Sequence, residues 1–198
     1  MKLVIQKQVH GSEVTEVTNS TEIWLPADAM VTTESDIGLV VYGADSAIIA
    51  FWKDGKIGVC HAGLSGYTKG LVKKMAEIFA GGECYVGPFY HRFDIRKDSF
   101  FKSIVDYGGS PYIIEDIHGI TFNFKKAIQH ELIGLNVMMD PRCTFDTPDL
   151  ASFKREHKDG FATENRLVIW MSEGKAMHRL FKPGENLQSY FNSINTSP

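Results

Sequence analysis

Cysteine is scarce in this sequence, where only Cys60, Cys84 and Cys143 occur among 198 residues. An odd and sparse set favours a reducing compartment over a disulfide framework. Long apolar runs are also missing, because no stretch approaches the roughly 20 residues that are needed to span a bilayer. The first residues, MKLVIQKQVHG, contain too short an apolar run for a signal peptide. We therefore expect a cytoplasmic protein that has no membrane partner.

An excess of one charge is absent as well. The sequence has 21 Lys and Arg against 24 Asp and Glu, a net charge of -3, so no global field attracts nucleic acid. Hydrophobic residues make up 43% and charged residues 23%, which is ordinary for a globular protein of this length. No repeat or linker divides the chain. We predict one domain over residues 1–198, without a nucleic-acid partner.

Strand-like runs crowd the first half of the chain, and helical spacing follows. The predicted strands are Leu3–Val9, Val14–Val17, Met30–Thr32, Gly38–Tyr42, Ala47–Trp52, Lys56–Cys60, Tyr112–Ile114, Asn136–Met139 and Leu167–Met171. The predicted helices are Tyr67–Phe79, Ser99–Tyr107, Asn123–Ile133 and Glu185–Ile194, with a frayed end at Asn195–Pro198. This mixture predicts an α+β domain.

The segment GADSAIIAFWKDGKIGVCHAGLSG is predicted to be a hairpin whose two-residue loop is Asp54-Gly55, the strongest short-range hairpin signal. In that register His61 lies opposite Ile48. Ser46 is then a diagonal neighbour of His61 on the same face, about 7–8 Å away at the backbone. Both side chains can reach one metal ion or one substrate atom.

Two alternatives remain open for this hairpin. A one-residue bulge at the turn would bring Cys60 to the face of His61, whereas without it Cys60 is a small buried hydrophobic residue. The same sequence is also compatible with a purely structural core hairpin that ends in a hydrogen-bonded histidine. The glycines between this strand and the next helix let backbone N–H groups face an anion, a weak signal on its own.

Several further stretches agree with a known family in order and spacing. They are QVHGSEV from Gln8, ADAMVT from Ala27, ADS from Ala44, HAGLSG from His61, Gly87-Pro88, Cys143-Thr144 and SFKR from Ser152. Over about residues 6–171 the chain resembles the YfiH family, also called the laccase-domain or purine nucleoside phosphorylase family. The family pattern runs QVHG, ADA, ADC, HAGWRG, GP, CT and FFSYRR.

The resemblance implies a layered α/β sandwich of mixed sheets, a fold shared with bacterial deamidase toxins. It implies one zinc ion at the positions of His10, Ser46 and His61. It also implies phosphorolysis of purine nucleosides or deamination of adenosine, with a purine nucleoside and phosphate as the small-molecule partners. Within this frame Asp28 or Asp45 orients a ligand histidine or carries protons.

The anion would be bound at the turn after His61 and by an arginine further along the chain. The residues expected to bind it are Gly63, Ser65, Gly66 and Arg155. Arg155 can equally be a surface charge, and Cys143, which matches the family's CT, is expected to line the cleft or to be structural.

The sequence departs from the family where chemistry is expected. Ser46 stands at the thiolate position, and a hydroxyl is a poor zinc ligand. Leu64-Ser65 replaces the family's Trp-Arg, which removes the natural clamp for phosphate. If Ser46 is the natural residue, we expect zinc to bind weakly or not at all.

Three functions fit these letters. The first is a zinc-dependent purine nucleoside enzyme, of the phosphorylase or adenosine deaminase type, with a weakened metal site. The second is a degenerate relative that binds a nucleoside or a partner without turnover. The third is a hydrolase in which His61 activates Ser46 as the nucleophile, with Asp28 or Asp45 as the orienting carboxylate.

Overall fold

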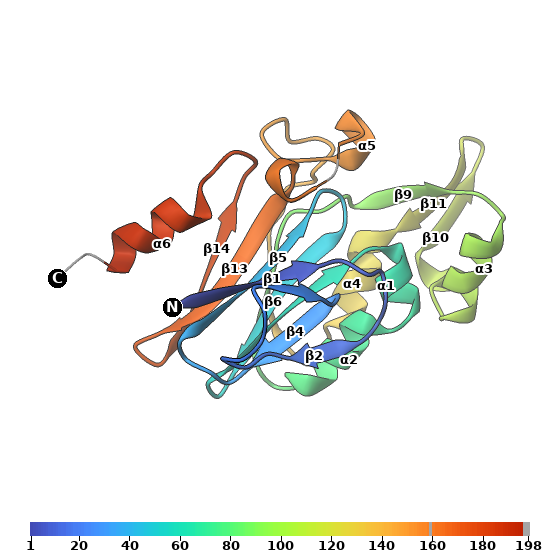
Figure 1. Cartoon of the computed structure of the whole chain (residues 1–198). Coiled ribbons are helices and arrows are strands. Elements are labelled where there is room, and N and C mark those ends of the chain that lie inside the picture. Colours follow the sequence, from blue (N-terminus) through green and yellow to red (C-terminus); the bar gives the residue numbers. More distant parts are fainter. Residues whose placement is uncertain (159, 196–198) are drawn as a thin grey trace.

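Two large β-sheets pack face to face in the computed structural model, which describes residues 1–158 and 160–195 (Figure 1). Residues 196–198 of the predicted frayed end lie outside this description. The first sheet has the order β14-β13-β5-β1-β3. Its strands are β1 (Lys2–Lys7), β3 (Trp24–Pro26), β5 (Ile37–Gly43), β13 (Asn165–Ser172) and β14 (Lys175–Phe181).

The second sheet has six strands in the order β12-β8-β6-β7-β4-β2. They are β2 (Val14–Glu16), β4 (Ala29–Thr32), β6 (Ala47–Lys53), β7 (Lys56–Ala62), β8 (Glu83–Val86) and β12 (Asn136–Met139). A third, small sheet has the order β10-β11-β9 and projects from this pair (Figure 1). Its strands are β9 (Arg92–Ile95), β10 (Ile113–Asp116) and β11 (Gly119–Asn123).

The described residues form six α-helices, some of which cover the outer faces of the two large sheets. They are α1 (Leu64–Thr68), α2 (Leu71–Ile78), α3 (Ser99–Asp106), α4 (Phe124–Glu131), α5 (Phe153–Glu156) and α6 (Leu187–Asn195). Side chains of α1, α2 and α4 share one buried cluster with the outer face of the six-stranded sheet, and α6 shares another with the outer face of the five-stranded sheet. None of the helices described is long and apolar enough to cross a membrane.

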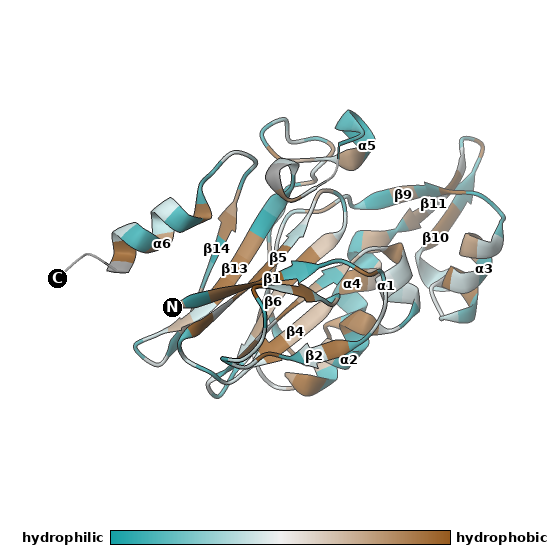
Figure 2. Cartoon of the chain, in the orientation of Figure 1, coloured by the Kyte–Doolittle hydropathy of each residue, from teal (hydrophilic) through white to brown (hydrophobic). Residues whose placement is uncertain are grey.

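A further core cluster lies between the two sheets, where alternate residues of both inner faces meet. The central strands are accordingly hydrophobic along most of their length (Figure 2). This arrangement confirms the predicted α+β class and the layered sandwich of mixed sheets. The predicted strands are all present, with ends shifted by one or two residues.

The predicted hairpin is confirmed, register included. Lys53 pairs with Lys56 and Ile48 pairs with His61. Asp54 and Gly55 have φ angles of 48° and 80°, so both loop residues are left-handed, as in the type I′ turn that matches strand twist. Because there is no bulge, Cys60 faces the helices and not the face of His61.

The predicted helix Tyr67–Phe79 is wrong at its start, because two helices occupy this region. Gly70 adopts the left-handed region at φ 74° and separates α1 from α2. The apolar spacing of residues 71–79 is correct for α2, whereas Tyr67 belongs to α1. A left-handed glycine interrupts the chain without disturbing the apolar pattern, which therefore did not show the break.

Candidate functional site

A cleft of about 580 Å³ opens where the loop after β1, the end of β7 and the α5 segment come together. It is lined by Gln8, His10, Ala44, Asp45, Ser46, His61, Gly63, Leu64, Ser65, Tyr90, Phe93, Asp94, Phe100, Phe153, Lys154, His157 and Glu164. The cleft therefore joins residues from the first third of the sequence to a segment more than one hundred positions later.

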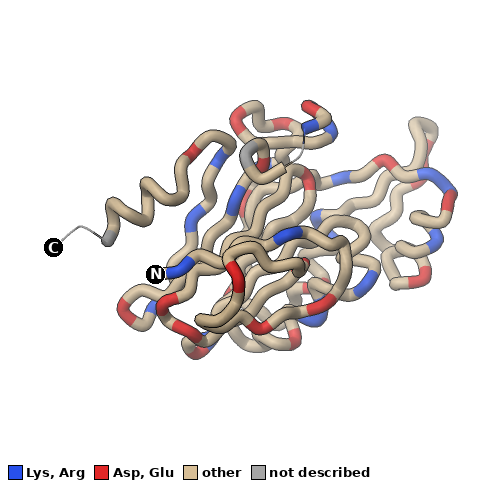
Figure 3. The backbone as a smooth tube through the Cα atoms, in the orientation of Figure 1, with Lys and Arg blue, Asp and Glu red and all other residues tan. Residues whose placement is uncertain are grey.

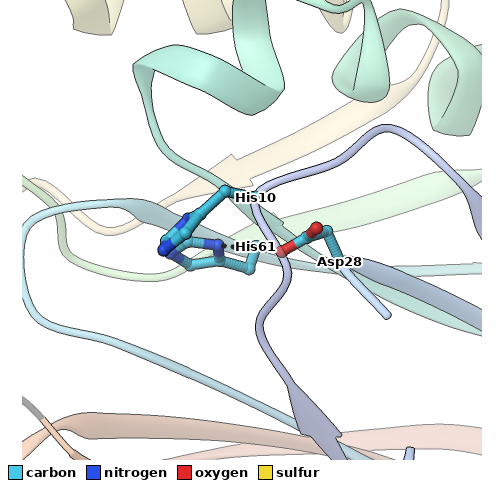
Figure 4. Close-up of side chains that lie close together, drawn as sticks. All are labelled: His10, Asp28 and His61. Carbon is cyan, nitrogen blue, oxygen red and sulfur yellow. Dashed lines mark ion pairs between the residues drawn. The ribbon is translucent and has the colours of Figure 1, made fainter. Parts of the chain in front are cut away.

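Two histidines that line this cleft converge with the carboxylate of Asp28, which is buried beside them (Figure 4). Candidate ligand atoms of His10, Asp28 and His61 all lie within 4.8 Å of one another. The ring centroids of His10 and His61 are 5.8 Å apart. His61 Nδ1 lies 3.6 Å from Asp28 Oδ1. Of the residues described, these form the one cluster that could hold a metal ion.

Strand pairing brings Asp28 and His61 together. Asp28 directly precedes β4, which is antiparallel to β7, and the backbone N–H of His61 donates to the Asp28 carbonyl at 2.8 Å. The two residues are therefore neighbours across the sheet, and the ring of His61 turns its Nδ1 toward the carboxylate. The other nitrogen of the ring is left facing His10 and the cleft (Figure 4).

The Asp28 carboxylate also holds the loop that carries His10. It accepts the backbone N–H of Val9 at 3.2 Å and that of Gly11. Between them His10 has a φ of 55°, a conformation that costs free energy for any residue other than glycine. Because three donors already surround the carboxylate, Asp28 is better placed to orient His61 than to bind a metal itself.

A second set of contacts secures His10 from the side of α1. The His10 carbonyl accepts the Lys69 ammonium at 2.6 Å and the Ser65 hydroxyl at 3.2 Å. The strained conformation is thus fixed on both sides. Strain that the surroundings enforce in this way is typical of functional sites.

Protonation states follow from burial and from the hydrogen bonds. Burial lowers the pKa of His61, although the Asp28 carboxylate opposes the shift, so the imidazole is neutral at neutral pH. Burial acts to raise the pKa of Asp28, but hydrogen bonds from His61 and from the Gly11 N–H outweigh it and hold that pKa below the usual value. The pair is a carboxylate beside a neutral imidazole, the state in which a histidine binds metal.

Ser46 lies in the same cleft, as its diagonal relation to His61 predicts. A Cβ built on Gly63 would lie 3.0 Å from Ser46 Oγ and 3.9 Å from His61 Cε1. The hydroxyl and the imidazole thus both approach Gly63. The structure brings together all three positions at which the family resemblance implies zinc, namely His10, Ser46 and His61.

Asp45 performs a structural task in this geometry. Its carboxylate accepts the Thr144 hydroxyl and the backbone N–H of Lys154, both at 2.7 Å. It thereby ties the start of α5 to the loop between β5 and β6. Of the two carboxylates proposed to orient a histidine, Asp28 is the one that pairs with His61.

The residues expected to bind an anion are dispersed. Gly63 and Ser65 line the cleft, whereas Gly66 is buried and does not. A Cβ atom at position 66 would lie 3.4 Å from the carbonyl oxygen of His61. Arg155 is not among the residues that line the cleft. Its guanidinium donates to the carbonyls of Thr144, Phe145, Thr147 and Leu150. Arg155 therefore stabilises the loop of residues 144–150, and its geometry does not support a role in anion binding.

The cysteines stay outside the cleft. Cys60 is fully buried, and burial raises the pKa of its thiol, which agrees with a small hydrophobic residue. Cys143 is half-buried and forms an isolated bridge with Phe89, and it does not line the cleft.

Sequence reasoning missed the aromatic wall of the cleft. Tyr90 comes from the segment before β9, Phe93 from β9, and Phe100 and Phe153 from α3 and α5. Tyr90 packs edge-on against Phe93 with centroids 5.1 Å apart. The Lys154 ammonium pairs with Asp94 and lies 4.9 Å above the Tyr90 ring. No short motif announces these residues, because only the packing of distant segments brings them together.

A family model described as multi-copper polyphenol oxidoreductase laccase matches residues 1–171. A purine nucleoside phosphorylase of Corynebacterium glutamicum is 26% identical over 186 residues, which cover 86% of this chain and 74% of that protein.

Two solved structures share the fold. The hypothetical protein YfiH of Bacillus licheniformis has a TM-score of 0.69 and 17% identity, and the match covers 79% of this chain and 70% of that one. The Neisseria meningitidis protein NMB0706 has a TM-score of 0.70 and 18% identity, with 87% and 76% covered.

Proposed function

The chain belongs to the multi-copper polyphenol oxidoreductase laccase family, the one its motifs resemble, and from that premise we propose a zinc-dependent enzyme of purine nucleosides with a weakened metal site. The observation that carries this proposal is the convergence of His10 and His61 in a cleft, with Asp28 fixing the orientation of His61. The relative named purine nucleoside phosphorylase supports the substrate class.

The donor set fits a divalent metal ion. His10 and His61 supply imidazole nitrogens, which zinc prefers, and Ser46 supplies a hydroxyl at the third position. Zinc, when bound with an open coordination position, lowers the pKa of its water ligand to around 7 and polarises oxygen atoms. Burial keeps His61 neutral, and the task of Asp28 is to hold the ring in one tautomer, so that the nitrogen facing the cleft carries the lone pair.

The cleft walls suit a nucleoside. Aromatic rings offer flat faces on which a base can stack, worth about 1–3 kcal/mol per base. Tyr90, Phe93 and Phe153 provide such faces beside the histidines. Among the described residues that line the cleft, Lys154 is the one with a permanent positive charge, so we assign phosphate to its side.

Two residues limit this activity. Ser46 offers a poor zinc ligand, and loss even of an outer partner of a metal ligand costs about 10–100-fold in affinity or activity. Ser65 carries no charge, and its hydroxyl already donates to the His10 carbonyl. We therefore expect slow or undetectable turnover of adenosine and inosine by the unaltered protein.

Elemental analysis and zinc titration test the metal site. Ser46→Cys should bind zinc at least 10-fold more tightly than the wild type. The matched control is Ser172→Cys, an exposed serine at the end of β13, which should leave zinc content unchanged. Equal zinc affinity of Ser46→Cys and wild type would contradict the proposed ligand set.

Turnover tests the reaction. The double variant Ser46→Cys, Ser65→Arg should gain nucleoside turnover when zinc is added. Chromatography measures the conversion of adenosine and of inosine, with and without phosphate. A double variant that binds zinc and nucleoside yet converts neither would favour a binding module. Rates of an efficient enzyme in the unaltered protein would contradict our account of Ser46.

A second candidate function rests on one specific observation. Asp28, His61 and Ser46 follow one another in space as carboxylate, imidazole and hydroxyl, the arrangement of a nucleophilic serine site. A hydrolase of this type needs no zinc, and Ser46→Ala would abolish its activity. A fluorophosphonate probe that labels the wild type but not Ser46→Ala would support it, and absence of labelling would dismiss it.

A further inference from the structure

A second cleft, which shares no lining residue with the first, lies between α6 and the outer face of the five-stranded sheet. Its volume is about 620 Å³, within the range of small-molecule sites. Apolar side chains make up most of its wall, namely Leu3, Ile5, Ile23, Phe161, Leu187 and Phe191. α6 carries no Lys, Arg, Asp or Glu (Figure 3). Glu185, just before this helix, does line the cleft.

One of the two side-chain cations that line this cleft is buried. Arg166 of β13 lines the cleft although its side chain is only 5% exposed. Its Nη2 donates to the carbonyls of Lys182 at 2.9 Å and Glu185 at 2.7 Å. Its Nε is buried and has no hydrogen-bond partner in the described part of the chain. The guanidinium also lies 5.2 Å from the Phe161 ring.

No carboxylate of the described residues forms an ion pair with this guanidinium. The oxygens of Glu185, which lines the same cleft, accept from Arg179 and from the Lys182 N–H. Burial lowers the pKa of Arg166 although Glu185 opposes the shift, so the positive charge is incompletely compensated. Buried charges are ordinarily paired, because an unpaired one carries the full cost of desolvation.

We propose that this cleft binds a small carboxylate with an apolar body, whose charge is recognised by Arg166 and whose chain lies along the wall formed by β1 and α6. The ligand supplies the counter-charge that the protein does not, and a charge-assisted hydrogen bond in this partly dry place is strong. Lys2, the other side-chain cation of the cleft, is occupied by the carbonyls of Asn19 and Thr21.

Calorimetric titration with sodium octanoate tests the proposal on the full chain. Octanoate should bind with a stoichiometry of one, whereas octan-1-ol and inorganic phosphate should each bind at least about tenfold more weakly, since each lacks one half of the recognised chemistry. If octan-1-ol bound as tightly as octanoate, the cleft would be an apolar groove without anion recognition. If phosphate bound as tightly as octanoate, it would be an anion site without an apolar subsite. Either result overturns the proposal.

Variants locate the site. Arg166→Met should weaken octanoate binding about tenfold or more, and Lys175→Met, an exposed cation at the far end of β14, should leave it unchanged. Arg166→Met also loses two hydrogen bonds to carbonyls, which can destabilise the fold. A second pair of variants, at an exposed residue, changes the charge of the cleft without this loss. Gln188 is exposed on α6 and lines the cleft. Gln188→Glu should weaken and Gln188→Lys strengthen binding by about two- to fivefold. An octanoate affinity that is the same in Gln188→Glu, Gln188→Lys and wild type would refute the assignment.

Discussion

Replacement of Asp28 by asparagine is the sharpest test of how the site is held. The carboxylate of Asp28 is 1% exposed, accepts the N–H groups of Val9 and Gly11, and faces His61 Nδ1 at 3.6 Å. Asparagine has the same shape, but one of its two terminal atoms is an NH₂ group, which cannot accept. At least one of the three donors is then left facing another donor inside the protein.

The magnitude follows from that lost acceptor. A hydrogen bond to a charged group contributes about 1.5–3 kcal/mol, and a buried donor without a partner costs about 1–3 kcal/mol. Since burial of the carboxylate itself has a cost that asparagine avoids, we expect Asp28→Asn to lower the free energy of unfolding by about 2 kcal/mol at pH 7. In a Ser46→Cys background the same change should weaken zinc binding about 10–100-fold.

The pH dependence gives a second readout. The folded state holds the pKa of Asp28 below its ordinary value, so the stabilisation is present above the unfolded pKa and is lost as pH falls through the lower folded value. The difference between Asp28→Asn and wild type should therefore be full at pH 7 and should shrink below about pH 4.

Urea unfolding followed by far-UV circular dichroism measures both effects. Asp94→Asn is the matched control, because Asp94 is an exposed carboxylate whose ion pair with Lys154 should be worth less than about 1 kcal/mol. An Asp28→Asn protein as stable as wild type at pH 7, and unchanged in zinc affinity, would show that the carboxylate neither holds the His10 loop nor orients His61.

Three further changes test other parts of the structure. Gly70→Ala should lower the free energy of unfolding by about 1–2 kcal/mol, because φ is 74° at this position. Urea unfolding measures this, with Gly55→Asn as the control, since asparagine tolerates the φ of 80° at position 55. Arg155→Met should destabilise by about 2 kcal/mol and expose residues 144–150 to hydrogen exchange, since its guanidinium donates to carbonyls of that loop; unchanged exchange would refute it. Because burial lowers the pKa of His61, wild-type stability should fall as pH drops below about 6.5, and His61→Asn should show a smaller fall.

The parts of the site that sequence reasoning reached are those with local causes. Asp54-Gly55 sets the hairpin turn, and the turn sets the register that places Ser46 beside His61. The neighbourhood of Asp28 and His61 depends on the pairing of β4 with β7, which joins strands about thirty residues apart in sequence. Only the family pattern, and not any short-range rule, suggested that the two would meet.

The parts that were missed depend on long-range packing. Asp45 binds Lys154 across 109 positions, and this contact, together with the small sheet, brings the aromatic wall over the histidines. The expected anion role of Arg155 illustrates the same limit, because an arginine beside a lysine gives no indication that its guanidinium holds together a loop of its own chain. Strands β3, β8, β9, β11 and β14 were also missed, being short or bounded by weak turn signals.

The structure also bears on whether this hairpin is merely part of the core. A histidine that only fills space needs a hydrogen-bond partner, and any buried acceptor would serve. Here the partner is a buried carboxylate kept ionised, and the same carboxylate fixes His10 at φ 55° so that a second imidazole faces the first. A left-handed histidine and a buried negative charge each cost stability, and neither improves the packing of the sandwich. The fold retains both costs although Ser46 stands at the third position. This combination favours a cleft that still uses its two histidines, and under the proposed function Ser46, not the frame around it, is where we expect activity to be limited.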